Sequence, residues 1–433
     1  MATPPRSAEK PMIRQHARTA LAIAIAASFF TVSRGQEGAA DLGARLREDA
    51  AVKVALEAVR TSEPSTVEQQ IELCEVAAPP FKETARAELY KKKFEALGLA
   101  NVRIDTAGNV VGDRPGLSEQ PHLLFTAHLD TVFPEDTKVK VTREGSVLRG
   151  PGIGDNCRGL AVLLAVVRAL NEAKIRTPGT ITFAGTVGEE GLGDLRGVKR
   201  LFNETLKGRI DRFVALDGAG LGITNVAVGS HRYRASFKGP GGHSYGAFGL
   251  ANPIHALGRA IAKISSIQVP ARPKTTFNVG RVGGGTSVNS IAFEAWLEMD
   301  MRSADPPSLQ ALDAQYRKAV DEALAEENAR WGGRGRLTVE NALVGDRPAG
   351  STPEDSPIMR AAISVDKALA IASDLGEGST ESNVPMSLKI PALTIDGGGR
   401  GSGSHSLNEA FDTTDAWRGA QRALLLVVAL TQK

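Results

Sequence analysis

Hydrophobic and polar positions beyond residue 40 follow two spacings, one typical of helices and one typical of strands. Residues 40–75 and 83–97 place apolar side chains at helical intervals between charges, and residues 101–111 have the pattern of a hairpin. Further on, strands and helices alternate. The predicted strands are 122–127, 180–186, 212–216 and 391–395, and the predicted helices are 158–173 and 416–431. This alternation predicts an α/β fold with a mixed sheet flanked by helices.

A block with a different pattern lies between the third and fourth of these strands. Its predicted elements are a strand at 231–238, a helix at 252–264, strands at 276–282 and 290–302, a helix at 307–330 and a strand at 337–343. The order βαββαβ is that of a ferredoxin-like domain. We therefore predict an inserted domain at residues 230–346 and a main domain assembled from residues 40–229 and 347–433.

The N-terminus has the pattern of a signal peptide, which we place at residues 1–35. Basic residues in 12–18 precede an apolar run at 19–32, and Ser33 and Gly35 supply the small residues of a cleavage site. The alternative is a membrane anchor, but the apolar run is shorter than the ~20 residues that span a bilayer. The pattern predicts an exported protein, periplasmic or secreted, without a stable membrane anchor.

Export changes the meaning of the charge. The chain of 433 residues has a formal net charge of +3, and 42% of its residues are hydrophobic. Residues 1–35 carry five basic side chains and one acidic side chain, a net charge of +4, so their removal leaves −1. No basic footprint for nucleic acid remains.

Candidate metal chemistry begins at His128-Leu129-Asp130, which follows the strand predicted at 122–127. An imidazole can bind a metal through one ring nitrogen. A carboxylate two residues later points to the same side of an extended chain and can hold the other ring nitrogen. Alone, this triplet is weak evidence, so its meaning depends on the acidic residues that follow.

Acidic residues recur at the ends of the other predicted elements. Asp155 precedes the apolar helix at 158–173, where it is either an N-cap or a metal ligand. Glu189-Glu190 follows the strand at 180–186 between glycines. It is either a solvated acidic loop or a ligand beside a general base, because adjacent residues of an extended chain point to opposite sides.

Asp217 and His405 complete the set, since they follow the strands at 212–216 and 391–395. Ligands of open α/β sheets bind beyond the carboxyl ends of the strands. Two histidines and three carboxylates, with one carboxylate shared, suit two zinc ions about 3.5–4 Å apart, and Co²⁺ or Mn²⁺ are alternatives. Cys74 and Cys157 are the two cysteines of the chain, too few for a thiolate-rich site, and whether they pair stays open.

Together these motifs resemble the co-catalytic di-zinc hydrolases, the family of peptidase T, carboxypeptidase G, acetylornithine deacetylase and succinyl-diaminopimelate desuccinylase. The glycine-rich segment 239–246 resembles the dimerisation domain of that family, a lid inserted into the catalytic domain. The resemblance implies a zinc-exopeptidase-like catalytic domain with an inserted ferredoxin-like dimerisation domain, and a homodimer formed through this lid.

The resemblance also implies a role for each residue. The implied metal ligands are His128 and Asp217 for one zinc, Glu190 and His405 for the other, and Asp155 as the bridge. Glu189 is the implied general base, and Asp130 supports His128. His243 is implied to reach the active site of the partner subunit and to stabilise the oxyanion there.

Asn289 and Arg302 resemble the lid residues that contact the substrate. Segment 379–383 also resembles a motif near the site, but Glu381 stands where the family has aspartate, and no role is implied for it.

The expected function is hydrolysis of amide bonds in small peptides by metal-activated water. An exopeptidase is favoured because peptidase-like members of the family tend to have aspartate at the Asp217 position, as here. The alternative is an N-acyl amino acid deacylase of the acetylornithine deacetylase type. A non-catalytic binding protein is the remaining alternative, which the presence of Glu189 and of every implied ligand disfavours.

Overall fold

The structure is a computed structural model that describes residues 42–433. The predicted signal peptide at residues 1–35 lies outside the described residues. From residue 42 onward, none of the helices is long and apolar enough to cross a membrane.

The main sheet has nine strands, and its centre is parallel. The order is β1-β2-β6-β3-β7-β17-β8-β15, with β16 also paired to β8. The four central strands are β6 (Thr180–Thr186), β3 (His122–His128), β7 (Arg212–Leu216) and β17 (Ala392–Ile395). Because β3 runs parallel to β6 and β7, and β17 runs parallel to β7, their carboxyl ends meet at one edge of the sheet.

The flanking strands match the predictions less well. The hairpin predicted at 101–111 forms as β1 (Ala100–Ile104) and β2 (Val110–Arg114). Strands that the pattern did not predict are β8 (Gly222–Ala227), β15 (Gly350–Ser351) and β16 (Asp374–Gly378). A separate small sheet consists of β4 (Thr142–Glu144), β5 (Val147–Arg149), β18 (Arg400–Ser402) and β19 (Ala410–Asp412).

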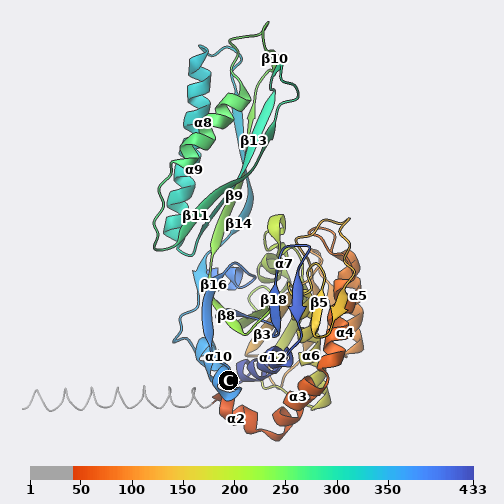
Figure 1. Ribbon diagram of the computed structural model, residues 1–433. Coiled ribbons are helices and arrows are strands. Elements are labelled where there is room, and N and C mark those ends of the chain that lie inside the picture. Colours follow the sequence, from red (N-terminus) through yellow and green to blue (C-terminus); the bar gives the residue numbers. More distant parts are fainter. Residues whose placement is uncertain (1–41) are drawn as a thin grey trace, which may run out of the picture.

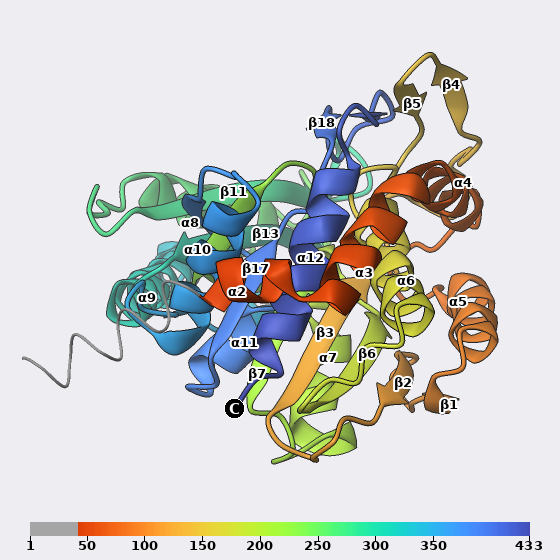
Figure 2. The same cartoon turned by 90° about the horizontal axis from the view of Figure 1, so that it is seen from below.

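Helices cover both faces of the main sheet, because neighbouring residues of a buried strand point to opposite sides. Leu123 and Phe125 of β3 belong to the larger core, whereas Leu124 belongs to the core on the other face. The larger core is formed with α3 (Ala50–Thr61), α6 (Cys157–Glu172), α10 (Pro357–Ala368) and α12 (Trp417–Leu430), as Figure 2 shows from below.

The second core contains residues of α7 (Arg196–Arg200), the π-helical turn η2 (Leu201–Thr205) and α11 (Asn383–Ser387). The remaining helices of the main unit are α2 (Leu42–Glu48), α4 (Glu63–Cys74) and α5 (Thr84–Ala96). The predicted α/β fold with a mixed sheet flanked by helices is therefore confirmed.

Residues 229–347 form a second unit, which has its own sheet and hydrophobic core and lies next to the main sheet (Figure 1). Its antiparallel strands have the order β11-β13-β9-β14. Their bounds are β9 (Gly229–Lys238), β11 (Thr275–Gly284), β13 (Glu294–Ser303) and β14 (Thr338–Arg347). The helices α8 (Pro253–Ser265) and α9 (Pro306–Arg330) pack on one face of this sheet.

The strand predicted at 290–302 was wrong in one respect, because it is two strands. Its first residues form β12 (Ser290–Ile291), which pairs with β10 (Gly242–His243) instead of with the second sheet. Its remainder is β13. The pair β10–β12 lies at the end of this unit that is remote from the main sheet (Figure 1).

Candidate metal centre

The five residues implied as metal ligands meet at the carboxyl edge of the parallel strands. His128 is the last residue of β3, Glu190 lies four residues beyond the end of β6, and Asp217 directly follows β7. Asp155 comes from the loop before α6, and His405 comes from the loop between β18 and β19. The parallel order of β6, β3 and β7 brings the first three together.

Asp155 lies between the two histidines. His128 Nε2 is 3.0 Å from Asp155 Oδ1, and His405 Nε2 is 3.2 Å from Asp155 Oδ2. On the outer sides, His128 Nε2 lies 3.6 Å from Asp217 Oδ1, and His405 Nε2 lies 3.0 Å from Glu190 Oε1. Each carboxylate oxygen of Asp155 thus faces a different histidine, which is the arrangement that a bridging ligand requires.

The donor set fits two divalent cations. The potential ligands form three overlapping groups, and within each group the ligand atoms lie within 4.8 Å of one another. The groups are His128 with Asp155 and Asp217; His128 with Glu189 and Glu190; and Asp155 with Glu190 and His405. Imidazole nitrogens and carboxylate oxygens are ligands of Zn²⁺, and one shared carboxylate is typical of two-metal hydrolytic sites. The described residues therefore form a potential metal site.

The pKa shifts of the centre show how strongly its charged groups interact. Hydrogen bonds to Asp155 and Glu190 raise the pKa of His405 to about 10. Burial alone would raise the pKa of Asp155, but the hydrogen bonds from His128 and His405 outweigh it and lower this pKa. Burial raises the pKa of Asp217, and the carboxylate of Asp155 adds to this effect. The carboxylates are thus arranged to receive positive charge.

Asp130 lies beside His128, as predicted, and also holds the loop that follows β6. Its carboxylate Oδ1 is 3.7 Å from His128 Nδ1, and the nearer partner of this ring nitrogen is the backbone oxygen of Asp130, at 3.0 Å. The carboxylate also accepts hydrogen bonds from the backbone N–H groups of Glu189 (3.0 Å) and Glu190 (2.8 Å). Asp130 therefore joins the end of β3 to the loop that carries both glutamates.

The loop before α6 is held by residues that the sequence did not single out. The N-cap of α6 is Asn156, whose side chain accepts from Gly159, so the alternative that Asp155 is a cap is wrong. The buried Glu409 carboxylate accepts hydrogen bonds from the backbone N–H groups of Gly152, Gly154 and Asp155. These bonds fix the loop that presents Asp155.

Glu189 forms a buried ion pair with Arg347, the last residue of β14. Arg347 Nη1 donates to Glu189 Oε1 at 3.1 Å, and Arg347 Nη2 donates to the backbone oxygen of Glu189. Burial raises the pKa of Glu189 to about 8, although the charge of Arg347 opposes this rise. Nothing in the sequence pointed to Arg347, because it lies 158 residues from Glu189 and belongs to the second sheet.

Glu381 is a second acidic side chain to which the sequence assigned no role. It is buried beneath the centre, and Thr126 Oγ1 of β3 donates to its Oε2 at 2.6 Å. Burial raises the pKa of Glu381 to about 7. The carboxyl group of Glu381 therefore contacts β3 at Thr126, two residues before His128.

The predicted substrate and oxyanion residues lie in two places. Arg302, on β13, lines the cavity that contains the metal-ligand candidates. His243 and Asn289 are exposed and belong to the β10–β12 end of the second unit, where Ser244 N donates to the Asn289 backbone oxygen at 2.9 Å. Within one chain, the structure does not bring His243 and Asn289 to the metal-ligand candidates (Figure 1).

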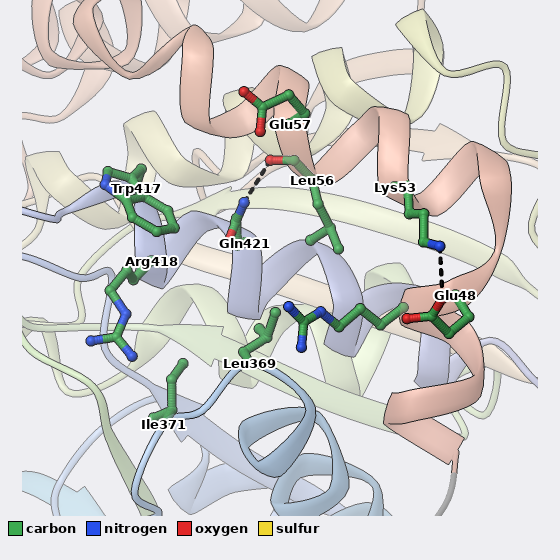
Figure 3. Close-up of a pocket in the computed structure, with 10 residues that line it drawn as sticks. Glu48, Lys53, Leu56, Glu57, Leu369, Ile371, Trp417, Arg418 and Gln421 are labelled. Atoms are coloured by element: carbon green, nitrogen blue, oxygen red, sulfur yellow. Dashed lines mark hydrogen bonds and ion pairs between the residues drawn. The ribbon is translucent and has the colours of Figure 1, made fainter.

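The cavity over the centre has a volume of about 300 Å³. Its other lining side chains include Arg232, Arg347 and Ser379. Another cavity, of about 350 Å³, lies between α2, α3 and the start of α12 and is lined by Trp417, Arg418 and Gln421 (Figure 3). None of the predicted site residues lines this second cavity, whereas the first is lined by Asp155, Glu189, Glu190, Asp217, Arg302 and His405.

Cys74 and Cys157 are both buried in one small hydrophobic cluster beside the centre. They are free cysteines in the structure, and Cys74 Sγ lies 3.4 Å from the backbone oxygen of Pro151. Cys157 opens α6, as predicted. Its place inside a hydrophobic cluster agrees with the interpretation of a small packing residue better than with that of a nucleophile.

Comparison with known proteins places this centre in a family. The sequence model described as Peptidase family M20/M25/M40 matches residues 124–429. The chain is 28% identical over 294 residues to the uncharacterised protein YqjE of Bacillus subtilis, which covers 64% of this chain and 76% of that protein. It is 27% identical over 306 residues to acetylornithine deacetylase of Salmonella paratyphi B, with 67% and 76% covered.

Solved structures show the same fold. A tripeptidase from Staphylococcus aureus superposes with a TM-score of 0.69 at 24% identity, covering 86% of this chain and 99% of the tripeptidase. A Bacillus subtilis protein described as a dinuclear metal binding peptidase superposes with a TM-score of 0.62 at 16% identity, with 85% and 98% covered.

Proposed function

Because the chain belongs to peptidase family M20/M25/M40 and is a metal-dependent hydrolase of amide bonds, we propose that it is a di-zinc exopeptidase of small peptides. The observation that carries the two-ion proposal is the position of Asp155, whose two oxygens face His128 and His405 separately. In this proposal, His128 and Asp217 hold one ion, Glu190 and His405 hold the other, and Asp155 is shared.

Glu189 is the proposed general base. Bound zinc ions would supply a water of lowered pKa and polarise the carbonyl of the scissile bond. Glu189 is buried among the ligand candidates, where its carboxylate can take a proton from the attacking water and pass it to the leaving amine. Arg347 holds this carboxylate in place through its hydrogen bond to Oε1.

Exopeptidase and deacylase chemistry break the same bond, so the choice between them depends on the substrate. The cavity of about 300 Å³ suits a small substrate of either class. The aspartate at position 217 and the fold shared with a tripeptidase support the peptidase proposal, and the similarity to an acetylornithine deacetylase keeps the deacylase as second candidate.

A homodimer through the second unit is part of the proposal. Large apolar side chains are exposed around the β10–β12 end, and Tyr245 and Phe248 are 90% and 72% exposed there. Val288 and Phe293, which flank β12 in the sequence, are exposed as well. Contact through this surface would cover apolar area that is costly in water. A partner subunit would also give His243 and Asn289 an active site to reach, with His243 as oxyanion donor.

Export is a further part of the proposal, and it is supported only by the pattern of residues 1–35. Expression of the full chain followed by cell fractionation and N-terminal sequencing of the mature protein tests it. A protein that keeps residues 1–35 and stays in the cytoplasm would contradict it.

The proposed function is tested by metal analysis of the purified protein together with two substrate panels. We expect about two zinc ions per chain, cleavage of dipeptides and tripeptides, and loss of activity after chelation that zinc restores. A second panel of N-acetylated amino acids separates the alternatives. Higher kcat/KM on the acetylated panel would make the protein a deacylase, and hydrolysis that chelation leaves unchanged would contradict both candidates.

A further inference from the structure

Three arginines from the second sheet face the metal-ligand candidates. Arg232 lies on β9, Arg302 on β13 and Arg347 on β14, which are neighbouring strands. In the strand register, Arg302 and Arg347 lie on either side of Ser230, and Arg232 lies two residues along β9 from it. The three side chains therefore share one face of the sheet, and all of them line the 300 Å³ cavity. We refer to these three residues as the arginine cluster.

One carboxylate holds two members of the cluster in place. Arg232 Nε donates to Asp300 Oδ1 at 2.8 Å, and Arg302 Nε donates to Asp300 Oδ2 at 2.8 Å. Arg232 Nη1 also donates to the backbone oxygen of Gly191, the residue after Glu190, at 2.7 Å. The Nε atoms of Arg232 and Arg302 thus fix both guanidinium groups beside the loop that carries Glu189 and Glu190.

The charges of the cavity do not cancel. When two divalent cations are bound, their four positive charges balance the carboxylates of Asp155, Glu190, Asp217 and the buried Asp130. Glu189 is balanced by its ion pair with Arg347. Arg232 and Arg302 share the single carboxylate of Asp300, so one positive charge remains on the wall opposite the ions. A buried or half-buried surplus of this kind is stabilised by an anionic ligand.

We propose that Arg232 and Arg302 of the arginine cluster bind two carboxylates of the substrate, so that the preferred leaving residue is aspartate or glutamate with a free α-carboxylate. This inference rests on the proposed function, since it names the substrate class of the same site. Arg232 is then the residue that distinguishes acidic from neutral side chains. Guanidinium groups suit this task because their planar set of N–H donors matches a carboxylate.

A second role for Arg232 would give a similar structure. Its bonds to Asp300 and Gly191 join the second sheet to the Glu190 loop, and a purely structural link would also weaken activity when removed. A structural link, however, would lower kcat/KM equally for every substrate. Only a specificity role changes the ratio between an acidic substrate and its neutral isostere.

The test compares zinc-loaded wild type with Arg232→Gln on the dipeptides Ala-Glu and Ala-Gln and on N-acetylglutamate and N-acetylglutamine. We expect wild type to favour the glutamate member of each pair about 10-fold to 100-fold, the factor of one charge-assisted hydrogen bond. Arg232→Gln should reduce this preference to within a few-fold. The matched control is Arg234→Gln, on the same strand and face, whose guanidinium pairs with Glu298 at 2.9 Å instead and does not line the cavity.

Binding gives a readout that does not depend on turnover. Isothermal titration of L-glutamate and L-glutamine into zinc-loaded wild type should show the same preference for glutamate. If Arg232→Gln does not fold, Arg232→Lys replaces it; because lysine keeps the charge, this variant should retain part of the preference. Equal kcat/KM for glutamate and glutamine substrates, or equal affinities, would overturn the inference while leaving the proposed function intact. Failure of the zinc-loaded wild type to cleave any member of the dipeptide, tripeptide and N-acetylated panels would mean that the proposed function itself is wrong.

Discussion

Arg347 donates a hydrogen bond to Glu189 across the boundary between the two sheets, and both side chains are almost fully buried. The pair unites the proposed general base with a strand end that lies 158 residues further along the chain. Because one charge compensates the other, the Glu189 carboxylate can be held inside a site that already contains three other carboxylates.

The first prediction concerns Glu189→Gln. A glutamine oxygen can still accept the hydrogen bond from Arg347, and none of the five proposed ligands changes, so zinc content should stay at the wild-type level. The variant cannot take a proton from water, and kcat should fall about 100-fold to 10,000-fold. Steady-state kinetics and metal analysis of the same preparation check both parts. Near-wild-type turnover would remove Glu189 from the role of base.

A second prediction concerns Asp130→Asn. Each oxygen of Asp130 accepts one backbone N–H, from Glu189 and from Glu190, and an amide would place an NH₂ group against one of these donors. We expect zinc affinity to fall about 10-fold to 100-fold, as is typical when a residue that holds a metal ligand in position is changed. Competition with a chromophoric chelator measures it. Asp136→Asn, an exposed change in the same loop, is the control and should leave affinity unaltered.

The sequence predicted the four central strands of the main sheet because they are apolar on both faces and each ends in or before a residue suited to chemistry. β6 and β7 have the predicted bounds, and α6 begins one residue before its predicted start. The strands β8 and β16 escaped prediction because they are short and largely polar or glycine-containing, so that no apolar run marks them.

The supporting residues of the site could not be predicted for a different reason. Glu409 holds the Asp155 loop, and Arg347 holds Glu189. The partners in each contact are at least 158 residues apart in the sequence. Such contacts depend on where the loops return in space, and a single sequence does not encode that position in a local pattern. The positions of His128, Asp217 and Glu190 were predictable because each lies at or just beyond the end of its own strand.

A third prediction uses the raised pKa of Glu381. Its pKa is about 7 in the folded protein against an ordinary value of 4.5, because the carboxyl group is buried. Between these values the folded state holds a proton that the unfolded state releases, so stability falls as pH rises through this window. In metal-free protein, Glu381→Gln should remove about 3 kcal/mol of this pH dependence. Urea unfolding of both proteins at pH 5 and pH 8 measures the difference.

Thr126→Val serves as the opposing control for this experiment. This change removes the Thr126 hydroxyl, which donates to Glu381 at 2.6 Å. In wild type this hydrogen bond favours the charged form of Glu381. The pKa of Glu381 should then rise further, and stability should fall more steeply towards pH 8 than in wild type. If Glu381→Gln and wild type lose the same free energy of unfolding between the two pH values, the buried carboxyl group does not titrate in this range.

The last prediction decides whether His243 acts across a dimer. His243 lies at the end of the second unit remote from the metal centre, so it can reach an active site only in another copy of the chain (Figure 1). His243→Ala and Glu189→Gln should each be nearly inactive as homodimers while keeping zinc and the dimeric state. In a mixed dimer, one site combines the intact Glu189 of the first variant with the intact His243 of the second. Co-expression of both variants should therefore restore about a quarter of wild-type activity, since half of the dimers are mixed and each has one complete site. Activity no higher than the average of the two homodimers would show that His243 does not complete the site of a partner subunit.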